Sequence, residues 1–358
     1  MANLRKGLLI AAAALLAILV IAALAAYDSI FGFGELQVAN TPLPGTLMPP
    51  EQAVLQIPLD GPIADEKAEL SGLAWYGDYL ILLPQYPARM GAGDGIIFAL
   101  PRQEIMAFIE GKSSTPLTPL KIPLSTGGFD ANIRGFEGFE AIAFHDQQVY
   151  LTIEAQSGGK MSGYLISGEI LADLSEIRLE AETLTEIPMQ LQSYNKSDEA
   201  LFLAGEQFFT LYEVNGEAFN PAPRATCFTL SLTPCVDIAF PHLEYRLTDA
   251  TVLDEQGRFW VINYQFPGDL NIKPKSDPLA NQYGQGASHS VGKSVERLVE
   301  YQYSDGSIQR TQRAPIQLQL VSDARNWEGI VRLDSLGFLL VTDKFPGTIL
   351  GFVEMPHK

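Results

Sequence analysis

A short unit recurs five times along this chain of 358 residues: a polar residue, then Gly or Ala, then two apolar segments joined by a short turn. The apolar segments are rich in β-branched and aromatic residues, and each turn contains Gly or Asp, which is typical of a β-hairpin. The polar residues that open the five units are Ser71, Glu140, Glu199, Asp249 and Glu328. Five hairpins in series predict a repeat architecture in which each unit packs against its neighbours.

Further strand-like segments follow the hairpins. Two follow each of the first four and one follows the fifth, while residues 53–59, AVLQIPL, form an extra strand-like segment before the first hairpin. If that segment joins the last unit, five four-stranded units result. The sequence therefore predicts an all-β fold over residues 51–358, a five-bladed β-propeller closed by its N-terminal strand, which leaves only short edges. A six-bladed propeller is the alternative, because the long steps before the second and fifth units can hold a degenerate blade. Helices are scarce, and residues 102–111 are the best candidate for a short one.

The N-terminus predicts export. Arg5 and Lys6 form a basic flank (residues 1–6) before residues 7–27, which carry no charge and are long enough to span a bilayer as a helix. The positive flank should remain cytoplasmic, which places the rest of the chain on the periplasmic or extracellular side. A cleaved signal peptide is the alternative, since small residues at 23–25 fit a cleavage site, and the protein would then be secreted. Residues 28–50, rich in Gly, Pro and Thr, are predicted to be a linker.

Two cysteines, Cys227 and Cys235, lie in the exported part. Export permits a disulfide between them, and their expected place on neighbouring outer strands of the third unit favours it. Two small buried apolar residues are the alternative. The pair alone cannot form a zinc site, and no CxxC motif occurs.

The charge of the chain restricts its partners. Lys and Arg number 24 against 42 Asp and Glu, a formal net charge of −18. Such a surface repels the phosphate backbone, so we expect no nucleic-acid partner, whereas it attracts cations.

Two columns of polar residues follow from the repeats. One consists of the residues that open the units, and four of these five are acidic. The second consists of the residues that end the return strands, which are Gln85, Glu154, Glu213, Asn263 and Asp343. Because the two strands of a hairpin are antiparallel, both columns should surround one mouth of a propeller's channel. The Gly or Ala after each opening residue should let neighbouring inner strands approach closely. A channel that is merely wet, with polar residues of no function, is the alternative.

Converging carboxylates need a cation, a proton or an arginine between them. Carboxylate and amide oxygens suit Ca²⁺, so the predicted metal ligands are Glu140, Glu328, Glu199 and Asp249. Arg134, Arg246, Arg325 and Lys344 lie near these positions in the sequence and could replace the metal. The same four side chains could instead hold an anionic group.

The remaining predicted site residues concern substrate. Glu154 and Asp343 are the candidate catalytic residues, as the general base or as further ligands. Arg134 and Arg325 are expected to grip an anionic group, because arginine binds phosphate and carboxylate in a bidentate manner. Trp327 precedes Glu328 at the mouth and is expected to contact the ligand.

Three repeats carry a resemblance to known proteins: LSGLAWYGDYLILLPQ, FEGFEAIAFHDQQVYLTIEA and NWEGIVRLDSLGFLLVTDK. They resemble the phytase-like family described as having esterase-like activity, and the related exported propellers called SdiA-regulated. Calcium-dependent lactonase propellers are more distantly similar. The acid of the family's E-G-[IL]-[AV] motif corresponds to Glu140 and Glu328, less closely to Glu199 and Asp249, and Ser71 departs from it.

Two functions follow as expectations. The resemblance implies a divalent-metal-dependent hydrolase of phosphoesters or other esters, in which Ca²⁺ polarises a small anionic or ester substrate. A non-catalytic envelope module that binds a ligand or a protein partner is the alternative, since propellers serve both roles. Residues 286–294, GASHSVGKS, do not match a phosphate-binding loop because five residues separate the glycines. The segment of residues 266–293 around this loop could cover the mouth as a lid.

Overall fold

The computed structural model describes residues 48–193 and 195–356. The predicted basic flank, the membrane anchor or signal peptide and most of the linker lie outside these residues. Within the described part, no helix combines the length and the apolar character that crossing a membrane requires.

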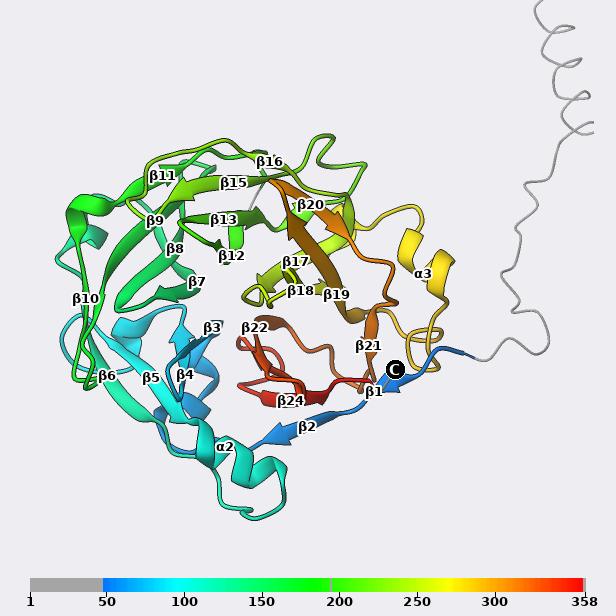
Figure 1. Cartoon of the computed structure of the whole chain (residues 1–358), viewed down its shortest axis with the longest axis horizontal. Coiled ribbons are helices and arrows are strands. Elements are labelled where there is room, and N and C mark those ends of the chain that lie inside the picture. The colour runs from blue at the N-terminus through cyan, green and yellow to red at the C-terminus, as the bar shows by residue number, and fades with distance from the viewer. Residues whose placement is uncertain (1–47, 194, 357–358) are drawn as a thin grey trace, which may run out of the picture. The chain divides into compact units, whose positions relative to one another are not determined.

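The described residues form an all-β fold of four hydrogen-bonded sheets around a common centre (Figure 1). One sheet contains β3 (Leu70–Tyr76), β4 (Tyr79–Pro84), β5 (Ile96–Pro101), β6 (Leu120–Ser125), β7 (Phe136–His145), β8 (Gln148–Ser157), β9 (Lys160–Ile170), β10 (Ile177–Leu179) and β11 (Thr185–Ile187). The second contains β12 (Asp198–Ala204), β13 (Gln207–Tyr212), β15 (Arg224–Thr229) and β16 (Ile238–Ala239). The third contains β1 (Glu51–Gln52), β14 (Val214–Asn215), β17 (Leu243–Ala250), β18 (Arg258–Gln265), β19 (Val295–Ser304), β20 (Ser307–Arg310) and β21 (Ile316–Leu318). The fourth contains β2 (Val54–Ile57), β22 (Trp327–Leu333), β23 (Gly337–Thr342) and β24 (Leu350–Glu354).

In the described part of the chain, helices are few and short. The predicted helix within residues 102–111 is α2 (Arg102–Ile109), and α3 (Pro278–Tyr283) lies in the long segment after β18. The 3₁₀ turns are η1 (Pro62–Ala64), η2 (Glu66–Ala68), η3 (Pro87–Arg89), η4 (Phe129–Asn132), η5 (Ala181–Thr183) and η6 (Leu270–Ile272).

All five predicted hairpins are present as antiparallel pairs: β3–β4, β7–β8, β12–β13, β17–β18 and β22–β23. Their first strands contact one another in a cycle, from β3 through β7, β12, β17 and β22 back to β3. The first strands, which carry the residues that open the repeats, therefore surround a common centre.

The two ends of the described chain meet in the fourth sheet. There β2 pairs antiparallel with β24, with Val54 opposite Val353 and Ile57 opposite Leu350. The predicted closure by the N-terminal segment is thus confirmed. The sequence did not predict that β1, just before β2, joins the neighbouring sheet as a parallel partner of β21.

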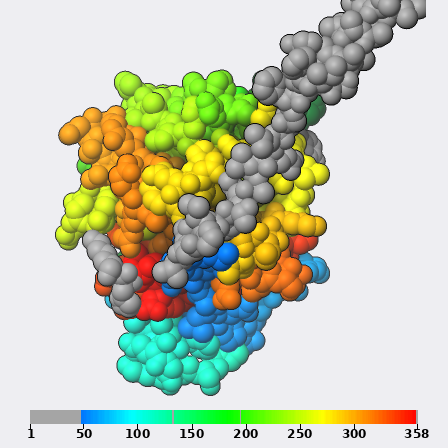
Figure 2. Space-filling view, turned by 90° about the vertical axis from the view of Figure 1, so that its right-hand side faces the viewer, coloured from blue at the N-terminus to red at the C-terminus, as the bar shows by residue number. Residues whose placement is uncertain are grey.

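Glu51 in β1 binds the loop before β19. Its carboxylate accepts hydrogen bonds from Ser288 N and Oγ and from His289 N and Nδ1, at 2.8–3.1 Å. Figure 2 shows the first described residues, in blue, against the yellow and orange segments that include this loop. These hydrogen bonds fix β1 to the loop before β19. A Cβ on Gly286 would lie 2.2 Å from Glu51 Cγ, so the close approach requires a glycine there.

Each hairpin has at least one register shift in its first strand, where the first strand has one more residue than the return strand opposite it. The shift lies at the start of β3, β12 and β22 and at the end of β17, and β7 has two. The unpaired or bulged residues include those that open the repeats. A β-bulge of this kind redirects a side chain. The predicted close approach is also confirmed, because a Cβ on Gly72 would lie 3.3 Å from Glu140 O and one on Gly329 would lie 3.1 Å from Gly72 C.

The two cysteines form a disulfide in the second sheet, with Cα atoms 5.0 Å apart. Cys227 lies in β15, but Cys235 precedes β16 instead of lying on it, and its N–H donates to Cys227 O at 3.0 Å.

Reduction of this disulfide is expected to lower the free energy of unfolding by about 2 kcal/mol, because it frees a short closed loop in the unfolded chain. The sequence separation is 8 residues, so the entropic effect is at the low end. Denaturant unfolding with and without a reductant measures the difference. Cys235→Ala should show the same loss and no response to the reductant; an unchanged midpoint would contradict the prediction.

Candidate functional site

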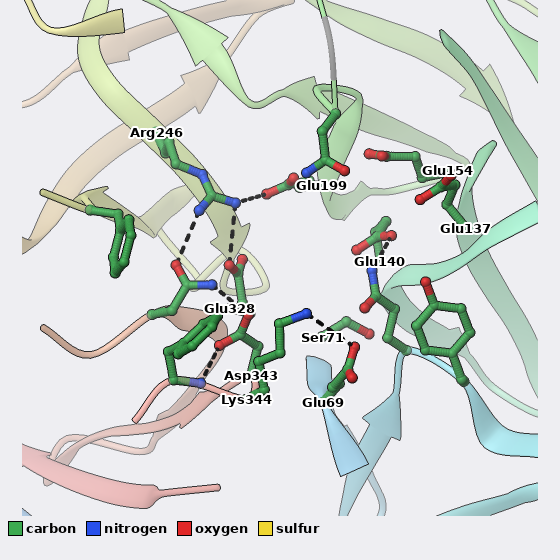
Figure 3. Close-up of a pocket in the computed structure, with 16 residues that line it drawn as sticks. Glu69, Ser71, Glu137, Glu140, Glu154, Glu199, Arg246, Glu328, Asp343 and Lys344 are labelled. Carbon is green, nitrogen blue, oxygen red and sulfur yellow. Dashed lines mark hydrogen bonds and ion pairs between the residues drawn. The ribbon is translucent and has the colours of Figure 1, made fainter. Parts of the chain in front are cut away.

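A cavity of about 310 Å³ lies where the first strands converge (Figure 3). Seven carboxyl groups line it, together with Arg246 and Lys344 as the only cationic groups among its described lining residues. The acidic residues are Glu69, Glu137, Glu140, Glu154, Glu199, Glu328 and Asp343. The cavity is therefore acidic, as the two columns predicted.

Seven members of the two predicted columns line this cavity: Ser71, Gln85, Glu140, Glu154, Glu199, Glu328 and Asp343. Glu213, Asn263 and Asp249 do not reach it, although all three are buried. Both columns thus converge at one site. The β17–β18 hairpin contributes neither of its column residues, Asp249 and Asn263, and contributes Arg246 instead.

Arg246 is the centre of one half of the site. Its Nη2 lies 3.3 Å from Glu328 Oε1 and 3.6 Å from Glu199 Oε2, and its Nη1 donates to Asn326 Oδ1 at 3.1 Å. Its Nε donates to Glu213. The guanidinium of Arg246 therefore lies among the carboxyl groups of Glu199, Glu213 and Glu328. The sequence left open whether a metal or an arginine lies among the converging acids.

Glu213 is the anionic counterpart of Arg246. It is fully buried, and Lys196 Nζ lies 3.1 Å from its Oε1. Burial alone would raise the pKa of Glu213, but the charges of Arg246 and Lys196 outweigh this effect and hold the pKa below its usual value. Glu213 is thus ionised at neutral pH.

The neighbouring acids respond differently. Burial raises the pKa of Glu328 to about 8, against the effect of Arg246, and the charge of Asp343 adds to the rise. Burial and the charge of Glu213 raise the pKa of Glu199 well above its usual value. Asp343, whose pKa is also raised by burial, accepts from Asn326 Nδ2 at 2.7 Å and from Phe345 N at 2.8 Å.

In the other half of the site no cationic side chain is among the described lining residues, although the charge of Lys196 lowers the pKa of Glu154 in part. Glu140 Oε1 accepts from Gln85 Nε2 at 3.0 Å, and Glu154 Oε2 accepts from Ser197 Oγ at 2.8 Å. Among the described residues, no Lys or Arg forms an ion pair with Glu137, Glu140 or Glu154. Burial raises the pKa of Glu154 to about 7, and burial together with the charge of Glu154 raises the pKa of Glu140 well above its usual value. Both carboxyl groups therefore bind a proton more tightly than an exposed glutamate does.

Aromatic rings and one more acid complete the lining. Arg89 Nη1 lies 3.0 Å from Glu69 Oε1, and Lys344 Nζ lies 3.8 Å from Glu69 Oε2. Arg89 also lies 3.6 Å from the ring centroid of Tyr86, and the rings of Phe266 and Phe345 lie 6.1 Å apart. Of the segment predicted as a lid, only Phe266 lines the cavity.

Arg325 and Trp327 are not substrate-binding residues of this cavity. Arg325 is 2% exposed and donates through Nε to Glu296 Oε2 at 2.9 Å and through Nη2 to Gln319 O at 2.7 Å. Trp327 is fully buried, and its Nε1 donates to the same Glu296 oxygen at 2.7 Å. Glu328 is the bulged residue of β22, and its side chain enters the cavity while that of Trp327 packs in the core.

Arg134 and Asp249 are also corrected. Arg134 is exposed in the turn before β7 and does not line the cavity. Asp249 accepts hydrogen bonds from Ala250 N at 2.8 Å and from Ile330 N at 2.7 Å, which fastens β17 to β22. The carboxyl group of Asp249 therefore binds backbone N–H groups and is not directed at the predicted metal position.

The predicted four-carboxylate calcium site does not fit this arrangement. Asp249 points elsewhere, and Arg246 lies beside both Glu199 and Glu328. Within the described residues, no group of three or more His, Cys, Asp or Glu side chains is arranged so that it could hold a metal ion.

Sequence reasoning missed several residues that position the acids. Asn326, Ser197 and Glu69 precede the opening residues Glu328, Glu199 and Ser71 by two positions. All three stand immediately before the first strand of their hairpin, so a polar residue at this recurring position was the available signal.

The chain was compared with known proteins. No protein-family model matches it, and no curated protein matches its sequence. Among solved structures, a glucose dehydrogenase has 13% identity and a TM-score of 0.45, covering 85% of this chain and 100% of that chain. A GH43 β-xylosidase/α-arabinofuranosidase from a compost microbial metagenome has 11% identity and a TM-score of 0.43, covering 86% and 96%. The GH43_1 enzyme from Xanthomonas citri has 10% identity and a TM-score of 0.45, covering 84% and 90%. Similarities this low carry no conclusion about the activity of this chain.

Proposed function

We propose that this protein is a hydrolase in which Glu154 acts as general base and Glu140 as general acid. The observation that carries the proposal is the pair itself: two buried carboxyl groups in one cavity. Burial raises the pKa of Glu154 to about 7, and burial together with the charge of Glu154 raises the pKa of Glu140 well above its usual value. Perturbed carboxyl groups with different proton affinities in a cavity are typical of acid–base sites.

The hydrogen bonds give each carboxyl a free oxygen. Ser197 occupies Oε2 of Glu154, which leaves Oε1 to accept a proton from water. Gln85 donates to Oε1 of Glu140, so a proton held by Glu140 lies on Oε2. Water attacks the electrophilic carbon and loses a proton to Glu154, while Glu140 protonates the departing oxygen as the carbon–oxygen bond breaks. The products together contain the atoms of the substrate and one water, and both carboxyl groups recover their protonation by exchange with solvent.

The substrate class follows from the charges. Neither arginine predicted to grip an anion lines the cavity, and Arg246 is engaged by Glu199, Glu213 and Glu328. A phosphoester would meet seven carboxyl groups, so the site favours carboxylic esters or glycosides. Two carboxyl groups suffice for the hydrolysis of a glycosidic bond, which needs no metal.

The test is a hydrolysis screen of the full-length protein with nitrophenyl esters, glycosides and phosphates, each with EDTA and with added Ca²⁺. The expected result is turnover of an ester or glycoside in EDTA that Glu154→Gln removes. Turnover that requires Ca²⁺ would restore the metal-dependent mechanism, with Glu137, Glu140 and Glu154 as the acids that lack a cation. Turnover that Glu154→Gln leaves intact would exclude the proposed base.

A non-catalytic module that binds a ligand or an envelope partner at this cavity is the second candidate. The acidity of the cavity favours it equally, because uncompensated carboxylates attract a ligand whether or not a bond is broken. Ligand binding by the wild type without turnover of any substrate class would select this function.

We also propose that the cycle of five hairpins is a five-bladed propeller. The closure of β2 on β24 and the cyclic contacts of the five first strands support it. Export of this domain stays a prediction from residues 7–27.

A further inference from the structure

We infer that the cavity binds an organic cation, a ligand that carries at least one ammonium group. This inference rests on the proposed function only because both concern the same cavity. The hydrolase proposal leaves the charge of the ligand open, and the inference specifies that charge. Figure 3 shows that the acids of the cavity come from all sides, whereas Arg246 and Lys344 lie toward one side.

The first argument is the balance of charge. Arg246 and Lys344 face seven carboxyl groups in the lining, and Lys196 adds one cation behind Glu213. Arg246 is already shared by Glu199, Glu213 and Glu328. On the opposite side, Glu137, Glu140 and Glu154 have no Lys or Arg partner within the described residues. A cationic ligand is the partner that this half of the cavity lacks, and its charge would offset the burial that now raises the pKa values of Glu140 and Glu154.

The second argument is an oxygen that accepts no hydrogen bond. Glu199 is 6% exposed and lines the cavity; its carboxyl is hydrogen-bonded to that of Glu213, and no N–H or O–H group of any other described residue donates to its Oε2. Its nearest cationic atom, Arg246 Nη2, lies at 3.6 Å. Buried carboxylate oxygens are nearly always satisfied, and an ammonium group carries three donors. A ligand N–H at this oxygen completes the site.

The third argument is the aromatic part of the lining. Tyr86, Phe266 and Phe345 present rings beside the acids. Two of these rings already lie beside cations, Tyr86 under Arg89 at 3.6 Å and Phe345 near Lys344 at 5.7 Å. Rings of this kind attract organic cations more than they attract a hydrated metal ion. The volume of about 310 Å³ suits a small molecule.

The test is calorimetric titration of the full-length protein with 1,5-diaminopentane, and with 1,5-pentanediol as the uncharged analogue of similar length. The diamine is expected to bind, with an affinity that falls as salt is added, and the diol is not. Glu199→Gln should weaken diamine binding roughly tenfold, since a loss of about 1.4 kcal/mol corresponds to that factor. Glu137→Gln, which removes an acid without a cationic partner, provides a second variant if Glu199→Gln folds poorly.

Glu206→Gln is the matched control. Glu206 is exposed in the turn at the far end of the β12–β13 hairpin, so the substitution changes the net charge equally but should leave the diamine affinity unchanged. Binding of Ca²⁺ without binding of the diamine would overturn the inference in favour of a metal, and equal binding of diamine and diol would show that charge is not recognised. Hydrolysis of neutral substrates without diamine binding would overturn this inference alone. Diamine binding without any hydrolysis would overturn the proposed function alone.

Discussion

Replacing Arg246 by Met is expected to lower the free energy of unfolding by about 3–5 kcal/mol, which is the usual effect of removing one partner from a buried ion pair. Glu213 is fully buried and ionised, and Arg246 is one of its two cationic partners. Lys196 remains in the variant, so the loss should lie near the lower end of this range. For a domain of this size, such a loss corresponds to a fall in Tm of roughly 5–10 °C, which thermal unfolding followed by circular dichroism measures.

Two further variants show where this effect comes from. Arg246→Met combined with Glu213→Gln should recover part of the loss, because the stranded charge is removed together with its partner. Arg178→Met is the surface control: Arg178 pairs with Glu176 at 2.7 Å but its side chain is 51% exposed, so the change should be about 1 kcal/mol or less. If Arg246→Met is no worse than Arg178→Met, the acids around Arg246 are neutral and need no counter-ion.

The repeat pattern predicted the hairpins, their cyclic order and the closing strand, because each depends on a local alternation of apolar and turn residues. It did not predict that β1 leaves its neighbour β2 and pairs with β21. That pairing depends on the contacts of Glu51 with Ser288 and His289, which lie far away in sequence. The bulge at each opening residue was also unpredicted, since a one-residue shift leaves no clear trace in the hydrophobic pattern.

The site could be predicted as a set of acids, but their individual roles could not. Sequence spacing brings Glu140, Glu199 and Glu328 to one place, yet it does not show which acids receive a cation. Arg246 lies three residues before Asp249, and the structure reverses their expected roles: the arginine enters the site, and the aspartate binds the backbone of β22. The difference lies in the register of β17, where a bulge separates the two residues.

Trp327 and Arg325 show the limit of reasoning from proximity in sequence. Both are sequence neighbours of the cavity residue Asn326, and Trp327 also precedes Glu328. Their side chains instead donate to the buried carboxylate of Glu296. A buried acid on β19 is a partner that no local pattern around residue 328 could indicate. The side-chain alternation of the strand, applied strictly, would have excluded Trp327 from the cavity.

Replacing Glu154 by Gln is expected to reduce kcat by 10²- to 10⁴-fold, the usual contribution of a general base. The amide keeps the size of the side chain and can still accept from Ser197 Oγ, so the variant should fold as the wild type does. Because a base must be deprotonated, the wild-type rate should rise with pH through about 7, the pKa of Glu154. Glu140 is the group that supplies the proton, because burial and, once Glu154 is charged, the charge of Glu154 raise the pKa of Glu140 well above its usual value. Initial rates between about pH 5 and pH 9 on the substrate found in the screen measure both effects.

The pH profile separates a catalytic role from a structural one. Glu154→Gln should remove the rise near pH 7, and its residual rate should be nearly independent of pH there. Glu140→Gln should reduce kcat by a similar factor, and the double variant should be little worse than either single one, because the two groups act in one step. Glu206→Gln should match the wild type at every pH. A Glu154→Gln protein that keeps both its rate and the rise would show that another group takes the proton, and Asp343, the other predicted catalytic acid, would then be the group to replace.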